Sequence, residues 1–335
     1  MTFARDLANF ADISANNTTF RNIIINNGFS IDQRNSGSSQ TFTAAAALAY
    51  SVDRWYGYCT GANITGARVA GAAPSQYYYR FTGATSNTAV GFGQRIEAAN
   101  SFHFANKTAV LSVNLASTSI TSVTWTAYYA TTTDTFGTLA SPTRTQIATG
   151  TFTITSTLSR YSAVMSVPAA ATTGIEIVFT TGALVASQTL TFDDVQFELG
   201  SSPSAFEQRP VGVELALCQR YYEKSFPYST APQNGPNSTS FVTSLGVLGY
   251  VSGNSMQVGF LKFTVQKRVA PTMTAYGNST GQTKYRDSIT SSTDLWSVSA
   301  LTFYAISESG STVSQNVVNN VVVPVQGHWI ADAEL

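Results

Sequence analysis

Between residues 20 and 207 the chain repeats one pattern, in which short apolar-rich segments are separated by turn residues roughly every ten to fifteen residues. Segments 109–115, 122–129 and 190–199 alternate apolar with polar side chains. Such alternation is typical of strands with one buried face. No strand–helix–strand alternation is present, which disfavours a parallel α/β sheet. The region therefore predicts an antiparallel β-sandwich or jelly roll, and an all-β fold class.

A junction at residues 192–224 ends this region and begins another. The small residues of 200–206 follow a closing strand, and Pro210 stands where a first helical turn accepts proline. Val213, Leu217 and Tyr221 then recur every fourth residue, which predicts a connecting helix within 208–224. This helix would join the jelly-roll domain at 20–207 to a smaller β-domain at 225–335. Strand candidates in the second domain are 241–250, 256–266, 271–276, 294–306 and 314–325.

Residues 2–13 show a helical period, and an N-terminal attachment helix and linker are expected over 1–19. The apolar positions on one face of this helix are Phe3, Leu7, Phe10 and Ile13. Because so short a helix is marginal alone, this stripe is expected to pack against its own domain or a partner chain.

The charge, hydropathy and cysteine content exclude several classes of protein. Charged residues make up 11% of the chain and the net charge is zero, so we expect no nucleic-acid partner. No apolar run reaches the roughly 18 residues of a membrane span, and the Met1 start lacks the apolar core of a signal peptide. We expect neither a membrane partner nor Sec secretion. Cys59 and Cys218 are too few for a disulfide framework, and buried thiols are expected.

Several ordered motifs resemble one family. Residues 26–34 (NNGFSIDQR), followed by 50–55 (YSVDRW), resemble the opening of tailed-bacteriophage fibre and virion-surface proteins with a carbohydrate-binding-module-like jelly roll. The junction, with its ELALCQRYY, and the terminal WIADAEL at 329–335 are similar to later elements of the same proteins. Asn35 departs from the glycine that usually follows Gln-Arg there.

The resemblance implies a non-enzymatic virion protein, assembled in the host cytoplasm and located on the tail or capsid surface. A homo-oligomer, and for a fibre a homotrimer, is expected, with other virion proteins as further partners. The leading interpretation is a tail-fibre adhesin that contacts host polysaccharide. The alternatives are a capsid decoration or head-fibre protein, and a glycan depolymerase.

Aromatic residues are the candidate glycan-binding positions, because tyrosine and tryptophan combine a large apolar face with a polar group. The candidates are Tyr77, Tyr78, Tyr79, Trp125, Tyr128 and Tyr129. Side chains alternate faces along a strand, so about half of these should point to the core. For Asp53-Arg54-Trp55 we favour a buried ion pair beside a core tryptophan over a glycan-facing cluster.

The resemblance also implies a structural calcium near the last strand of the jelly roll, with Asp193, Asp194 and Asp32 as candidate ligands. Calcium takes about six to eight oxygen ligands, and these three carboxylates supply only part of that set. Otherwise no cofactor is expected. His103 and His328 have no metal-binding spacing, and no pair of carboxylates is singled out for hydrolysis, so no catalytic residue is predicted.

Overall fold

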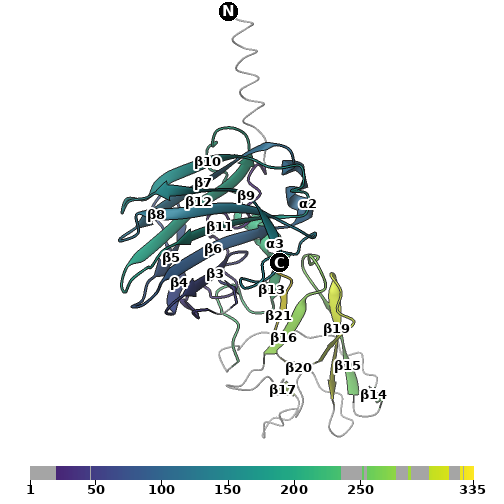
Figure 1. The fold of residues 1–335 in the computed structure, drawn as a ribbon. Coiled ribbons are helices and arrows are strands. Elements are labelled where there is room, and N and C mark those ends of the chain that lie inside the picture. The colour runs from purple at the N-terminus through teal and green to yellow at the C-terminus, as the bar shows by residue number, and fades with distance from the viewer. Residues whose placement is uncertain are drawn as a thin grey trace, which may run out of the picture. The chain divides into compact units, whose positions relative to one another are not determined.

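The computed structural model describes residues 20–45, 47–234, 251–252, 255–276, 286–287, 302–316, 325–326 and 328–335. The predicted attachment positions Phe3, Leu7, Phe10 and Ile13, and the strand predicted at 241–250, lie outside the described residues. The described chain is all-β, with antiparallel sheets throughout (Figure 1). The fold class is therefore confirmed.

Two compact units divide the chain. The first comprises Met1–Ser30, Gly37–Val211 and Leu335, and the second comprises Ile31–Ser36 and Gly212–Glu334. Residues 31–36 thus belong to the second unit, although they lie within the predicted jelly-roll range 20–207.

Two six-stranded sheets face each other in the first unit. The first sheet runs in the order β1 (Gln40–Phe42), β4 (Ile64–Ala70), β5 (Tyr77–Thr82), β12 (Thr189–Leu199), β7 (Thr108–Ser117) and β10 (Ser159–Ser166). The second runs β2 (Ala49–Tyr50), β3 (Tyr56–Thr60), β6 (Ala89–Ile96), β11 (Ile175–Thr181), β8 (Ser122–Ala130) and β9 (Arg144–Thr153). A short helix α2 (Ala98–Ser101) and a 3₁₀ turn η1 (Phe102–Phe104) follow β6.

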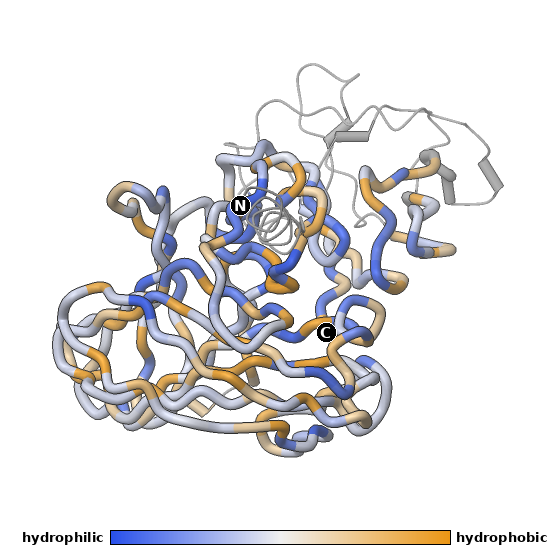
Figure 2. The backbone as a smooth tube through the Cα atoms, turned by 90° about the horizontal axis from the view of Figure 1, so that it is seen from above, coloured by the Kyte–Doolittle hydropathy of each residue, from blue (hydrophilic) through white to orange (hydrophobic). Residues whose placement is uncertain are grey.

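The core of the sandwich is aromatic. Phe92 stacks on Trp55 at 4.8 Å and on Tyr79 at 4.7 Å between ring centroids. Phe29 and Phe192 pack beside the same ring. Hydrophobic and hydrophilic positions follow one another over short stretches of the strands, as Figure 2 shows. This alternation puts one face of each sheet in the core and leaves the other for solvent or ligands.

Residues 50–58 are rich in apolar and aromatic side chains and predict a single strand, but the structure has two strands there. The chain turns at Ser51–Trp55, where the amide of Trp55 donates to the carbonyl of Val52 at 3.0 Å, so β2 and β3 are separate.

Strand β6 was not predicted, because Gly91 and Gly93 weaken the sequence signal for a strand. In the structure the rings of Tyr58 and Tyr56 occupy the space where these glycines lack a side chain.

Among the described residues, the second unit contains three smaller sheets. They are β13 (Tyr222–Lys224), β21 (His328–Asp332) and β16 (Thr272–Tyr276); β14 (Val251–Ser252), β15 (Ser255–Lys262), β19 (Gly310–Asn316) and β18 (Thr302–Tyr304); and β17 (Arg286–Asp287) with β20 (Val325–Gln326). Leu261, Phe263, Val313, Trp329 and Ala331 form its core among the described residues.

The connecting helix is shorter than predicted. Helix α3 spans Val211–Gln219, whereas the expected range continued to residue 224. The chain leaves the helix because Tyr222–Lys224 pairs with β21 in register, with Tyr222 opposite Asp332.

The prediction that both cysteines are buried thiols is confirmed, since Cys59 and Cys218 are both buried and neither forms a disulfide.

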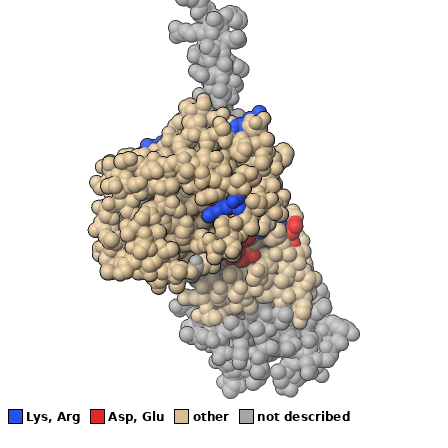
Figure 3. Space-filling view, viewed as in Figure 1, with Lys and Arg blue, Asp and Glu red and all other residues tan. Residues whose placement is uncertain are grey.

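Among the described residues, no helix combines the length and apolar character needed to span a membrane. Charged side chains occupy only small patches on the face shown in Figure 3, as expected for a chain with 11% charged residues.

Candidate functional site

The outer face of the first sheet carries a groove of ≈ 380 Å³. It crosses the adjacent strands β5, β12 and β7, where Arg80 lies opposite Thr191 and Thr191 lies opposite Ala116. The next turn, between β9 and β10, contributes residues from the side. The lining residues are Tyr78, Arg80, Ala116, Ser117, Thr118, Ser156, Leu158, Thr189 and Thr191.

Tyr78 is the aromatic residue of this groove. Its neighbours on β5, Tyr79 and Phe81, point into the core, so the strand alternation turns Tyr78 and Arg80 outward. The Tyr78 hydroxyl accepts a hydrogen bond from the amide of Ala72 at 2.9 Å and reaches the Ala72 carbonyl at 3.3 Å. The ring is therefore held in place before any ligand arrives.

Arg80 supplies the positive charge of the groove. Its Nε donates to Thr191 Oγ1 at 3.2 Å. Around it, Ser117 Oγ donates to the Thr189 carbonyl at 2.8 Å, and the Thr189 amide donates to Thr118 Oγ1 at 2.8 Å. The result is a concave surface with one aromatic ring, one guanidinium and several hydroxyl groups on rigid strands.

A carboxylate cluster lies further along the same sheet. The register of β12 shifts between Asp193 and Gln196, and Asp194 adopts a positive φ of 45° in this bulge. Asn114 Nδ2 donates to Asp193 Oδ2 at 3.2 Å and to Asp194 Oδ2 at 3.3 Å. Ser75 Oγ donates to Asp193 Oδ2 at 2.7 Å. Asp193 Oδ1 is buried and has no hydrogen-bond partner among the described residues.

The cluster of Asp193 and Asp194 supplies only part of the ligand set expected for calcium. Asp194 lies beside the opening motif, since a Cβ on Gly28 would stand 3.8 Å from Asp194 Oδ1. However, the described residues contain no group of three or more His, Cys, Asp or Glu side chains that could hold a metal ion. Asp32 instead accepts a hydrogen bond from the Asn35 amide at 2.9 Å. A calcium ion with Asp193, Asp194 and Asp32 as ligands stays a prediction.

The cluster predicts a pH dependence of stability. Burial and the neighbouring charge of Asp193 raise the pKa of Asp194 to about 7, against an opposing effect of Arg160. An acid whose pKa is higher in the folded state stabilises the fold below its unfolded pKa, and this contribution is lost as pH rises through the folded pKa. In chelator-containing buffer, the melting temperature of the sandwich unit should therefore fall between about pH 4 and pH 7 relative to that of Asp194→Asn. Parallel pH profiles of the two proteins would contradict this assignment.

The predicted aromatic positions separate into buried and outward residues. Tyr79 and Trp125 are in the core, with exposed fractions of 0% and 6%, so the prediction that they contact glycan is corrected. Tyr129 is partly buried and packs against the same core. The guanidinium of Arg68 lies 4.4 Å from the ring centroid of Tyr77, and that of Arg144 lies 4.2 Å from the ring centroid of Tyr128.

Tyr78 is thus the predicted aromatic residue that lines the groove. The sequence reasoning missed Arg80 and Thr191. The alternation of residues 77–81 places Arg80 on the face of Tyr78, which was a usable signal. No comparable signal links Thr191 to them, because that contact depends on the pairing of distant strands.

The opening motifs meet in the first unit. Trp55 Nε1 donates to the Asn26 carbonyl at 3.1 Å, and Asn26 Nδ2 donates to the Asp53 carbonyl at 2.9 Å. Asp53, Arg54 and Trp55 are all buried, with exposed fractions of 0%, 1% and 0%. The predicted burial of this cluster is confirmed, and the ion pair between Asp53 and Arg54 stays a prediction.

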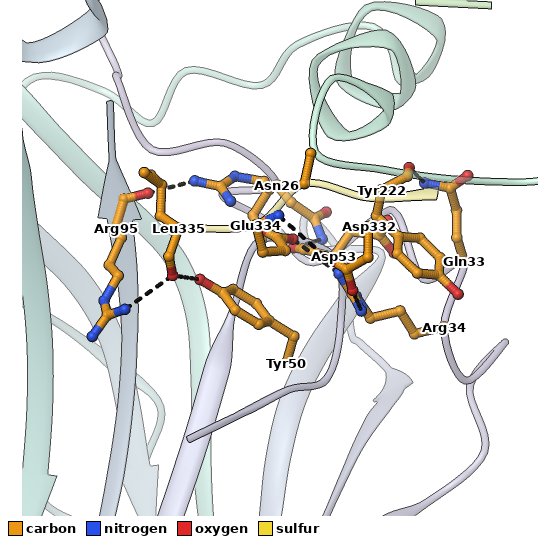
Figure 4. A network of polar contacts seen from close by, with 12 residues as sticks. Asn26, Gln33, Arg34, Tyr50, Asp53, Arg95, Tyr222, Asp332, Glu334 and Leu335 are labelled. Carbon is orange, nitrogen blue, oxygen red and sulfur yellow. Dashed lines mark hydrogen bonds and ion pairs between the residues drawn. The ribbon is translucent and has the colours of Figure 1, made fainter. Parts of the chain in front are cut away.

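The remaining motifs meet in the second unit. Arg34 Nη1 pairs with Asp332 Oδ2 at 2.9 Å, and its Nη2 pairs with Glu334 Oε1 at 3.2 Å (Figure 4). The Arg34 guanidinium also lies 3.8 Å from the ring centroid of Tyr222, whose carbonyl accepts a hydrogen bond from Gln33 at 2.9 Å. Residues of the opening Gln-Arg, of the junction Tyr-Tyr and of the terminal Asp-Ala-Glu therefore form one network in the fold.

This network predicts the effect of removing Arg34. Arg34→Ala should lower the free energy of unfolding of the second unit by about 2–3 kcal/mol, because it leaves two partly buried carboxylates and a tyrosine ring without their partner. Calorimetry of the full chain would measure it, with Arg160→Ala as a control that changes an exposed arginine. Equal, small effects of both variants would contradict a stabilising role for the network.

The chain has low similarity to several solved structures. No protein-family model and no curated protein matches the chain. A solved structure titled "CBM4 structure and function" is 16% identical over 53% of this chain and 100% of its own, with a TM-score of 0.32. A putative sugar binding protein from Bacteroides thetaiotaomicron is 13% identical over 53% and 100%, with a TM-score of 0.33.

The enzymatically active domain of bacteriophage CBA120 tailspike protein 4 is 14% identical, and the match covers 55% of this chain and 22% of that one, with a TM-score of 0.32.

Proposed function

We propose that the sandwich unit binds a glycan in the groove formed by β5, β12 and β7. The observation that supports this is the convergence of Tyr78, Arg80 and several hydroxyl groups in one concavity of ≈ 380 Å³. Sugars present apolar C–H faces that pack on an aromatic ring, and hydroxyl groups that need hydrogen-bond partners. The volume is within the range of about 300–1,000 Å³ that is usual for small-molecule sites.

Binding without cleavage is part of the proposal. Glycoside hydrolysis generally requires two carboxyl groups on either side of the scissile bond. The described residues that line the groove include none. Asp193 and Asp194, on the same sheet, are held by Asn114, and Asp193 also by Ser75.

The chain's biological role is proposed as that of a bacteriophage tail-fibre or receptor-binding protein. The ordered motifs described above support this role. In it, the N-terminal stripe of Phe3, Leu7, Phe10 and Ile13 would attach the chain to sister chains or to the particle. Weak binding at each groove would be strengthened by the several copies on one virion.

Replacing Tyr78 tests the binding site. Tyr78→Ala should weaken glycan binding by about tenfold or more, because the groove loses its aromatic face. Binding of the full chain to a glycan array, followed by titration calorimetry with the bound sugar, would measure the change. Tyr128→Ala, which removes the candidate tyrosine of the other sheet, is the matched control and should leave binding unchanged because Tyr128 does not line the groove. If both variants bind like the unaltered chain, the groove is not the glycan site.

Cryo-electron microscopy of a particle that carries this chain tests the role. Density for the chain at the tail, with the groove facing outward, is the expected result. Density on the capsid shell, with the groove covered by capsomers, would instead identify a decoration protein.

A further inference from the structure

The groove has a charge as well as a shape. Arg80 is its charged lining residue, and the described lining residues include no carboxylate. The Nε bond to Thr191 Oγ1 orients the guanidinium. Nη1 and Nη2 of Arg80 donate to no group among the described residues, so both terminal nitrogens are available to a ligand.

Guanidinium groups bind carboxylates through two parallel hydrogen bonds, a geometry that lysine does not reproduce. The Arg80 side chain is half-buried in this groove. A charge-assisted hydrogen bond there is screened less by salt than one on an open surface. Hydroxyl groups of Thr189 and Ser156 stand at the same concavity and suit the remaining positions of a sugar ring.

The other charged groups of this face do not neutralise Arg80. Asp193 follows Thr191 on the outer side of β12 but does not line the groove, and its Oδ2 already accepts hydrogen bonds from Ser75 and Asn114. Asp194 lies in the same bulge, where the positive charge of Arg160 acts on its carboxyl group. The groove is therefore a positive site on a chain that has few charges elsewhere.

We infer that the ligand of the groove is an acidic glycan, in which a sugar carboxylate accepts hydrogen bonds from Arg80 while the sugar ring packs on Tyr78. This inference rests on the proposed function and names the class of sugar that the groove takes.

The experiment compares polyuronates with their carboxyl-reduced forms. The full chain is tested against pectate, alginate and hyaluronan, and against each polymer after reduction of its carboxylates to alcohols. We expect binding to at least one acidic polymer and binding at least about tenfold weaker to its reduced form. Arg80→Gln should lose this preference, and the affinity of the unaltered chain for the acidic polymer should fall with rising salt.

Arg160→Gln is the matched control, because it removes the same charge from the same sheet but outside the groove, where Arg160 Nη2 donates to Ser112 Oγ at 2.8 Å. It should keep the preference, and melting temperatures should confirm that both variants fold. Equal binding to acidic and reduced polymers, or an unchanged preference in Arg80→Gln, would overturn the acidic-glycan inference and leave glycan binding standing. If the chain binds none of these polymers and no neutral glycan on an array, both proposals fail.

Discussion

Glu176→Ala should destabilise the sandwich unit by about 3–5 kcal/mol. Glu176 is fully buried on β11 and accepts hydrogen bonds from Arg95 Nε at 2.8 Å and from the Tyr56 hydroxyl at 2.7 Å. It also pairs with Arg144. Removing the carboxylate leaves Arg95, which is 6% exposed, without its ion pair in a site that water does not reach freely. Differential scanning calorimetry of the full chain would measure the loss.

A matched variant separates charge from shape. Glu176→Gln keeps the shape of the side chain and one hydrogen-bond acceptor but removes the charge. Its loss of stability should therefore be smaller than that of the alanine variant and still well above that of a substitution at an exposed position. A loss below about 1 kcal/mol in both variants would show that the buried ion pairs contribute little to stability.

Trp55→Ala should cost about 3–5 kcal/mol in the same unit. Trp55 is fully buried, stacks on Phe92, and binds the Asn26 carbonyl through its indole nitrogen. Its removal opens a cavity in the aromatic core and breaks the link between the two opening motifs. Chemical denaturation, followed by the fluorescence of the remaining tryptophans, would measure the change.

Trp55→Phe is the control for this substitution, because it keeps an aromatic ring against Phe92 and loses the indole N–H. We expect about half of the loss or less. If phenylalanine costs as much as alanine, the hydrogen bond to Asn26 dominates. If neither variant lowers the free energy of unfolding, Trp55 is not central to the core.

Much of the sandwich was predictable because its signal is local. A strand exposes alternate side chains on opposite faces, so residues 77–81 alone indicate that Tyr79 and Phe81 share one face and Tyr78 and Arg80 share the other. The same reasoning assigns Trp125 and Tyr128 to opposite sides of β8. Alternation does not indicate which of the two faces is buried, so the sequence does not distinguish the core residues Tyr79 and Trp125 from glycan-facing aromatic residues.

Strand β6 shows where local signals fail. Gly91 and Gly93 argue against a strand when they are considered alone. In the structure, tyrosine rings from β3 lie over both glycines, so tertiary packing compensates for the missing side chains. The helix end at Gln219 is a similar case, since pairing with β21 ends the helix before the sequence pattern does.

The sequence by itself determined the all-β class, which side chains of its clearest strands share a face, and the motifs that resemble virion proteins. Tertiary structure alone decided that Arg80 meets Thr191, which is 111 residues away, and that Glu176 lies between Arg95 and Arg144. The physical reason is that side-chain alternation is a property of a single strand, whereas a groove or a buried ion-pair network depends on which distant strands hydrogen-bond to one another and in which register.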